Sequence, residues 1–247
     1  MALVTGVGRR VGIGFTVATK LATDGFDVGW SSWSPYDARM TWGADDEIAD
    51  AAMSQFTKSG ARSVAVEADL EQPESVPALF DHVEKELGPI SVLVMCHAES
   101  VDSGILDTSI ESFDRHFAVN ARATWLLIRE YGLRYRMAPS VGRIIAMTSD
   151  HAVNNLPYGA SKGALDRITL AAAHEFAHLG ITANVINPGP TDTGWMSPEI
   201  RAQVLAETPL HRIGTPVDAA NLVSFLCSPQ GGWINGQLLH SNGGLGS

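Results

Sequence analysis

The chain has 247 residues, of which 45% are hydrophobic and only 18% charged, and its 17 basic and 27 acidic side chains give a formal net charge of −10. This length suits one large α/β domain or two small ones, and the apolar content excludes a disordered chain. An acidic chain lacks the basic surface that binds a phosphate backbone, and two distant cysteines, Cys96 and Cys227, form neither a disulfide framework nor a metal cluster, so we expect no nucleic-acid partner and no metal.

Short apolar runs alternate with longer amphipathic segments along the whole chain. The runs predict strands at 2–4, 27–30, 63–66, 92–95, 143–147, 181–186 and 237–240. The segments between them predict helices at 12–24, about 44–59, 74–87, 112–137, 158–178 and 216–227. Because the strands are apolar throughout and alternate with helices, the pattern predicts a doubly wound α/β fold whose parallel sheet is covered by helices on both faces.

No linker, repeat or low-complexity segment divides the sequence, so residues 1–247 are predicted to form a single domain. Residues 31–43 and 194–216 fit no periodicity well, and both are expected to lie as loops or short helices over the carboxyl edge of the sheet, where α/β folds bind ligands. The N-terminus has no signal pattern, and no run approaches the ~18 apolar residues of a membrane span. We therefore expect a soluble, cytoplasmic protein.

A glycine-rich loop over residues 5–14, with the sequence TGVGRRVGIG, joins the first predicted strand to the first helix. Glycines let the backbone approach a diphosphate closely, and the helix N-terminus offers N–H groups to it. The spacing is not GxGxxG, and a plain tight turn is the alternative, but a complete βαβ unit follows the loop. We expect this loop to bind a dinucleotide, with contacts from Gly6, Arg9, Arg10, Gly12, Ile13 and Gly14.

The turn after the second strand carries the hydroxyls of Ser31 and Ser32 and no acid before Asp37. Chains that bind NAD usually place an acid there, about 20 residues past the glycines, to hold the ribose 2′-hydroxyl. The two serines, with Arg9 and Arg10, would suit a 2′-phosphate instead, and NADP(H) is therefore favoured over NAD(H). The alternative is that both arginines point into solvent.

Tyr158 and Lys162 lie at positions i and i+4 of one predicted helix and so share a face. A nearby ammonium favours the phenolate, so we expect the pKa of Tyr158 to be lowered toward the working range of a general acid–base. The YxxxK pattern alone occurs often by chance. Its setting is more informative, because this helix follows the fifth strand, whose end carries Ser149, and so begins at the ligand edge.

Taken together, these segments resemble the short-chain dehydrogenase/reductase family of the single-domain type, over essentially all 247 residues. The resemblance rests on residues 5–14, 68–70, 119–120, 142–149, 158–162, 184–189 with Thr193, and 242–244. It implies a Rossmann-type sheet of seven parallel strands and hydride transfer between a nicotinamide and a carbonyl or secondary alcohol. The chain is most similar to the family's 3-oxoacyl-thioester (acyl carrier protein) reductases, so a 3-oxoacyl thioester is the default substrate.

The resemblance also implies a catalytic tetrad of Asn120, Ser149, Tyr158 and Lys162. Tyr158 would act as general acid–base, Ser149 would donate a hydrogen bond to the substrate oxygen, Lys162 would hold the nicotinamide ribose, and Asn120 would support a water in the proton relay. Further implied cofactor contacts are Asp69, Leu70, Ala98, Asn120, Tyr158, Lys162, Pro188, Gly189, Thr191 and Thr193.

In this family the helix at 158–178 and the long helix before it build a homodimer, often within a homotetramer. The small residues of the 158–178 segment allow such close helix packing. They would equally suit packing of the helix against its own sheet.

Three departures from the family pattern stand out. The glycine loop carries two additional residues, and residues 95–98 read Met-Cys-His-Ala where the family commonly has Asn-Asn-Ala-Gly. Other groups must therefore do the structural work of that segment. Ser149 lies only nine residues before Tyr158, and the shortened loop at 150–157 predicts a different or more open substrate pocket.

Several other residues are candidates for substrate contact. His151 adjoins Ser149, and Trp195 and Met196 belong to a predicted substrate lid at about 194–216, although both could simply pack. His116 is interpreted as structural or interfacial, and Cys96 as a small buried residue rather than a nucleophile. Two alternatives stay open: reduction of another small ketone, and a non-catalytic protein that senses NADP(H).

Overall fold

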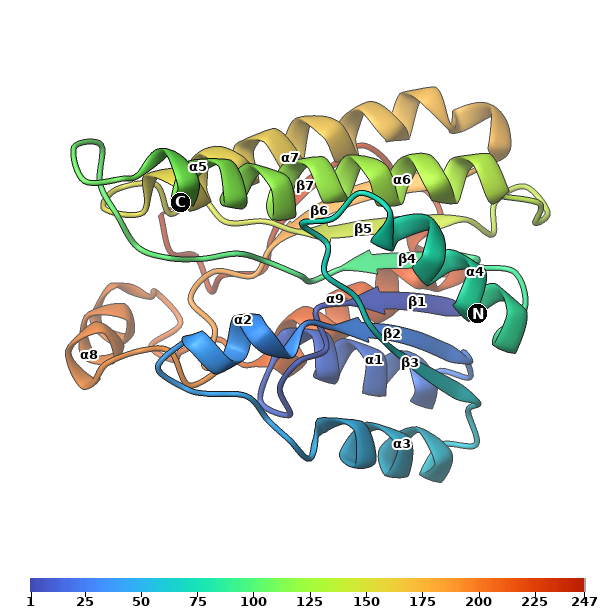
Figure 1. Ribbon diagram of the computed structural model, residues 1–247, viewed down its shortest axis with the longest axis horizontal. Helices are drawn as coiled ribbons and strands as arrows, with labels where there is room; N and C mark the ends of the chain where they lie inside the picture. Colours follow the sequence, from blue (N-terminus) through green and yellow to red (C-terminus); the bar gives the residue numbers. More distant parts are fainter. Residues whose placement is uncertain (247) are drawn as a thin grey trace.

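The computed structural model describes residues 1–246, and seven parallel strands in it form one sheet in the order β3-β2-β1-β4-β5-β6-β7 (Figure 1). The strands are β1 (Ala2–Thr5), β2 (Val28–Ser32), β3 (Ser63–Glu67), β4 (Val92–Met95), β5 (Arg143–Met147), β6 (Thr182–Asn187) and β7 (Leu238–His240). The doubly wound, Rossmann-type prediction is confirmed, and each predicted strand is found within one or two residues of its expected bounds.

Helices cover both faces of this sheet, and short helices lie at its edge. They are α1 (Ile13–Thr23), α2 (Ser34–Arg39), α3 (Ile48–Lys58), α4 (Ser75–Leu87), α5 (Ile110–His116), α6 (Ala123–Arg134), α7 (Leu156–Glu175), α8 (Pro198–Glu207) and α9 (Pro216–Cys227). In Figure 1, α4, α6 and α7 lie on one face, and α1, α3 and α9 on the other.

Alternate residues of each strand pack into two separate hydrophobic cores, one on each face of the sheet. Leu3 and Leu93 pack toward α4, α6 and α7, whereas Val4 and Val94 pack toward α1, α3 and α9. All four side chains are fully buried, because a parallel sheet between two helical layers hides both faces of its strands.

One predicted element is wrong in detail: the helix expected at 112–137 is not continuous. The structure divides it into α5, a π-helical segment at Phe117–Arg122, and α6. A π-turn inserts one extra residue into the i→i−4 pattern and is frequent at functional sites. The apolar periodicity continues through this insertion, so the sequence pattern gave no sign of it.

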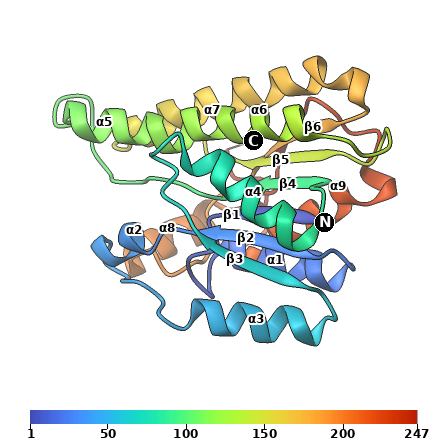
Figure 2. The ribbon, with the colours of Figure 1, turned by 45° about the vertical axis from the view of Figure 1, so that its right-hand side comes forward.

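The two regions without clear periodicity were expected to be loops or short helices, and each contains a short helix. Residues 31–43 contain α2, and residues 194–216 contain α8. Figures 1 and 2 show both helices beyond the carboxyl ends of the strands, beside the loop that leads from β4 to α5. No helix within the described residues 1–246 is long and apolar enough to span a bilayer.

Candidate active site

The predicted site residues gather at the carboxyl edge of the sheet, because each ends a strand, follows one, or lies on a helix that begins there. The glycine loop follows β1, Ser31 and Ser32 end β2, Asp69 and Leu70 follow β3, Ala98 follows β4, Ser149 follows β5, and residues 188–193 follow β6. Asn120 lies in the π-helical segment, and Tyr158 and Lys162 lie in the first two turns of α7.

Asn120 is fully buried, and its side-chain amide is held at both ends. Its Oδ1 accepts a hydrogen bond from the backbone N–H of Glu99 at 2.8 Å, and its Nδ2 donates to the Glu99 carbonyl at 2.9 Å. The same Nδ2 also donates to Ser161 Oγ at 2.9 Å. The amide is therefore fixed between the segment after β4 and the helix α7.

Ser161 links Asn120 to the start of α7. Its hydroxyl donates to the carbonyl of Tyr158 at 2.8 Å. One turn along, Lys162 is 2% exposed, and its Nζ lies 5.6 Å from the centroid of the Tyr158 ring. Ser161 thus links Asn120 to Tyr158, and Lys162 lies near the Tyr158 ring, so three of the four expected tetrad residues lie close together.

The expectation of a lowered pKa for Tyr158 is wrong for this structure. Burial raises the pKa of Tyr158 to about 12, and burial lowers the pKa of Lys162 to about 8. Burial of the phenol is the physical reason, and the Lys162 ammonium does not offset it with a hydrogen bond, because it donates to the Met147 carbonyl at 2.8 Å. Tyr158 therefore carries its proton at neutral pH, which is the state needed to protonate a carbonyl oxygen.

Ser149 lies at the start of the shortened loop, and its Oγ accepts a hydrogen bond from the His151 backbone N–H at 3.2 Å. No hydrogen bond joins Ser149 to Tyr158 within residues 1–246. The loop folds back on α7 so tightly that a Cβ on Gly159 would lie 2.7 Å from both Ala152 Cα and the His151 carbonyl oxygen. The His151 side chain itself is exposed.

His97 belongs to the segment after β4 that departs from the family pattern, and its ring supplies structural contacts for that segment. Its ring bridges Thr5 Oγ1, at 2.6 Å from Nδ1, and the Val119 carbonyl, at 3.1 Å from Nε2. Because a carbonyl only accepts, Nε2 carries the proton and Nδ1 accepts from the threonine hydroxyl. Burial lowers the pKa of His97 to about 3, so the ring is neutral. It ties β1 to the π-helical segment that holds Asn120.

One further sequence interpretation agrees with the structure, and a second agrees in part. His116 is fully buried, and its ring bonds to the Ser112 carbonyl and to the Val101 backbone N–H, which is a structural role. Cys96 is half-buried rather than buried, and burial of its thiol raises the pKa to about 12, which keeps the thiol protonated at neutral pH and argues against a nucleophile.

The glycine loop fits a diphosphate. Helix α1 begins after Gly12 with no side-chain cap and no acidic residue in its first turn, so its N-terminal N–H groups remain available to an anion. Gly6 has a φ of +76°, and a Cβ there would lie 2.5 Å from the His97 backbone nitrogen. Only glycine can occupy this position without moving the chain after β4.

Neither arginine of this loop points freely into solvent. Arg9 lies between Asp37, with its Nε 3.5 Å from Oδ1, and the ring of Trp42, and its Nη1 donates to the Thr193 carbonyl at 2.9 Å. Arg10 is paired with two acids, Asp45 and Glu47, at the surface.

Sequence reasoning missed a set of contacts made by α2. Arg39 forms an ion pair with Glu99, and Tyr36 Oη donates to the Ser100 carbonyl at 3.5 Å. These residues are single polar positions about 60 positions apart in the chain, without motif or periodicity, so no sequence signal pairs them.

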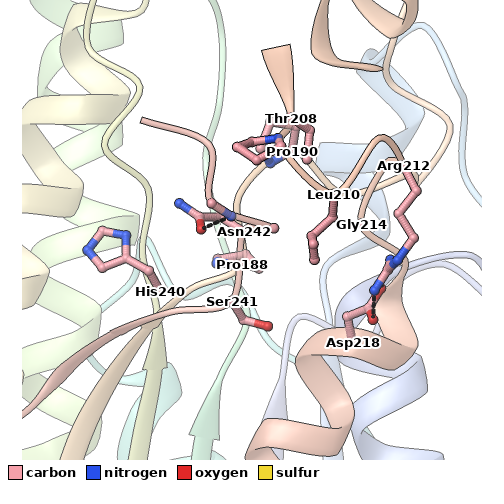
Figure 3. Close-up of a pocket in the computed structure, with 13 residues that line it drawn as sticks. Pro188, Pro190, Thr208, Leu210, Arg212, Gly214, Asp218, His240, Ser241 and Asn242 are labelled. Carbon is pink, nitrogen blue, oxygen red and sulfur yellow. Dashed lines mark hydrogen bonds and ion pairs between the residues drawn. The ribbon is translucent and has the colours of Figure 1, made fainter. Parts of the chain in front are cut away.

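The predicted lid begins beside the turn after β6. Trp195 is 43% exposed, and its Nε1 donates to the Thr191 carbonyl at 3.0 Å, while Met196 is half-buried. A cavity of about 450 Å³ lies between this turn and the residues after β7. Figure 3 shows its lining residues, with the Arg212–Asp218 ion pair on its wall. The charge of Arg212 in this wall is already balanced by the carboxylate of Asp218.

Comparisons with known proteins agree with this geometry. Residues 6–246 match the family described as Enoyl-(Acyl carrier protein) reductase. The chain is 35% identical to the uncharacterized oxidoreductase YjdA of Bacillus subtilis, over 99% of this chain and 96% of that protein. It is 34% identical to an NADPH-dependent aldehyde reductase-like protein, chloroplastic, of Arabidopsis thaliana, over 99% and 93%. A short-chain dehydrogenase of Burkholderia cenocepacia, crystallised in complex with NADP, has a TM-score of 0.88 at 29% identity and covers 100% of this chain and 97% of its own.

Proposed function

Because the chain belongs to the short-chain dehydrogenase/reductase family, we propose that it is an NADP(H)-dependent oxidoreductase that moves a hydride between the nicotinamide and a carbonyl or secondary alcohol carbon. The observation that carries the proposal is the close placement of the buried Asn120, Ser161 and Lys162 around Tyr158 at the carboxyl edge of the sheet. The name of the chloroplastic relative and the NADP complex of the Burkholderia enzyme support the choice of NADP(H).

The residues at this edge fit the dinucleotide. The N-terminus of α1 would hold the diphosphate, and Ser31, Ser32 and the two loop arginines would hold the 2′-phosphate. Arg10 is better placed than Arg9 for this, since its side chain is 48% exposed and a phosphate dianion could replace its surface carboxylates. Asp69, Leu70, Ala98, Pro188, Gly189, Thr191 and Thr193 would complete the cofactor site.

When bound, the cofactor supplies or accepts the hydride, and the chain's own residues handle the proton. In reduction, Tyr158 gives its proton to the carbonyl oxygen as negative charge grows there, and Ser149 donates a hydrogen bond to the same oxygen. Removing one such oriented donor typically costs ~2.7–4 kcal/mol in the barrier. Lys162 binds the nicotinamide ribose hydroxyls, and Asn120 holds a water that resupplies the proton.

For the substrate we retain a 3-oxoacyl thioester as the default, with another small ketone or aldehyde as the alternative that the chloroplastic relative's name favours. His151, Trp195 and Met196 would contact it, under a lid at about 194–216. We further propose that residues 1–247 act as one domain, in the cytoplasm, as a homodimer or homotetramer.

The test is consumption of NADPH, and of NADH at equal concentration, with a panel of ketones, diketones, aldehydes and 3-oxoacyl-thioester mimics. We expect at least one carbonyl compound to be reduced, with NADPH preferred. If the wild-type protein binds NADPH but reduces nothing in the panel, the non-catalytic sensor is the better interpretation. Equal turnover with NADH would overturn the cofactor assignment alone.

A further inference from the structure

The short helix α2 is joined to the segment after β4 by an ion pair between Arg39, whose side chain is 38% exposed, and the buried Glu99. The Glu99 side chain is 4% exposed, and Arg39 is the one basic residue paired with it in the part of the chain that the structure describes. A carboxylate removed from water in this way is stable only with a cationic or hydrogen-bonding partner. Arg39 therefore keeps Glu99 in place.

The backbone of the same Glu99 is the main support of Asn120. Its N–H and its carbonyl bind the two ends of the Asn120 amide, at 2.8 and 2.9 Å. A shift of Glu99 toward solvent would break both bonds at once. The side-chain amide of Asn120 would then keep only its hydrogen bond to Ser161.

Two titratable neighbours of Glu99 cannot replace the charge of Arg39. These neighbours are Tyr36 and His116. Burial raises the pKa of Tyr36 and lowers the pKa of His116, so both are neutral near pH 7.

We propose that Arg39 and Glu99 are a positioning pair for Asn120, through which α2 sets the geometry of the proton relay. This inference rests on the proposed function for its effect on turnover. The physical link itself, from Arg39 through Glu99 to Asn120, does not depend on it. In the proposed mechanism neither Arg39 nor the Glu99 carboxylate contacts the reacting atoms.

A double-mutant cycle in turnover tests the proposal. Arg39→Met should lower kcat by about tenfold to a hundredfold, the range expected when a catalytic group is displaced, and should change NADPH affinity less. In an Asn120→Ala background the same substitution should cause no further loss, because the group it positions is gone. An equal loss in both backgrounds would show that Arg39 acts on the cofactor or substrate directly, and the proposal would be wrong.

Three variants sharpen this cycle. Arg39→Lys keeps a cation and should recover part of kcat. Glu99→Gln combined with Arg39→Met removes the uncompensated charge, and should be more active than Arg39→Met alone. Arg62→Met is the matched control: it breaks an exposed ion pair with Asp27 at the amino end of the sheet, and should leave kcat unchanged.

A second cycle separates this inference from the proposed function, since it needs no substrate. The Tm of the Arg39→Met/Asn120→Ala double variant should fall by less than the sum of the two single losses, because both substitutions break one network. Additive losses would overturn the link even in an active enzyme. If the wild type reduces no carbonyl compound, the proposed function fails, and the Tm cycle still decides whether Arg39 supports Asn120.

Discussion

The Nζ atom of Lys162 lies 5.6 Å from the centroid of the Tyr158 ring, yet its hydrogen bond goes to the carbonyl of Met147 at 2.8 Å. The two groups share one face of α7 without being bonded to each other. The phenol keeps its proton, and under the proposed mechanism the ammonium would exchange the Met147 carbonyl for the ribose hydroxyls of a bound nucleotide. This arrangement suits proton delivery during reduction.

Replacement of Tyr158 by Phe removes only the hydroxyl that gives the proton. We expect kcat for reduction to fall by about 10²–10⁴-fold, the usual contribution of general acid–base catalysis. NADPH binding, followed by its fluorescence, should change little, because the ring and Lys162 remain. Residual turnover close to that of the wild type would remove Tyr158 from the proposed mechanism.

NADPH binding should weaken as the pH rises through about 8. Burial lowers the pKa of Lys162 from 10.5 to about 8, so the side chain is charged below that pH and neutral above it. The neutral amine loses the charge that strengthens its hydrogen bonds to the ribose. The measurement is the Kd of NADPH between pH 6 and 10 for the wild type and for Lys162→Met. The variant should bind NADPH more weakly, and its Kd should show no step at about pH 8. A step of equal size in both proteins would mean that another group titrates there.

The sequence predicted the layers and the place of the site for a simple physical reason. Buried strands such as the one carrying Leu3 and Val4 must be apolar on both faces, and parallel strands bring their carboxyl ends to one edge. The expected cofactor and catalytic residues could therefore be assigned to one region without any contact information.

What the sequence did not reveal depends on contacts across the fold. The π-turn at Asn120 leaves the apolar pattern of its helix intact. The pairing of Arg39 with Glu99 joins α2 to the segment after β4, and these two segments meet only when β2 and β4 flank β1. The direction of the Tyr158 pKa shift was mispredicted because its cause, the burial of the phenol, exists only in the folded chain.

His97 should make the fold sensitive to mild acid. Its pKa is lowered from 6.5 to about 3 in the folded state, so between these values the unfolded chain binds a proton that the folded chain excludes. Stability is therefore fully present above about pH 6.5 and falls as the pH drops toward 3, by up to ~1.4 kcal/mol per pH unit.

The comparison that isolates this effect is His97→Gln, which keeps a donor and an acceptor but does not titrate. At pH 7 the variant should be less stable by about 1–3 kcal/mol, because the bonds to Thr5 and Val119 are imperfectly replaced. Its free energy of unfolding in urea, measured from pH 7 to 4, should fall less steeply than that of the wild type. Parallel slopes would mean that His97 is already protonated, or solvated, in the folded protein.

Two glycines of α7, four residues apart, give a matched pair of substitutions. A Cβ on Gly159 would lie 2.7 Å from Ala152 Cα and from the His151 carbonyl oxygen, whereas a Cβ on Gly163 would meet nothing within 4 Å. Gly163→Ala should therefore stabilise the helix by up to ~1 kcal/mol and leave turnover unchanged.

Gly159→Ala must push the backbone of the loop away from α7, at a cost of about 1–3 kcal/mol. Ser149 moves with this loop, because it is the residue at which the loop begins. We expect kcat/KM for the carbonyl substrate to drop in Gly159→Ala alone, with NADPH affinity close to that of the wild type. If both alanine variants are equally active, the packing of residues 150–155 against Gly159 does not set the position of Ser149.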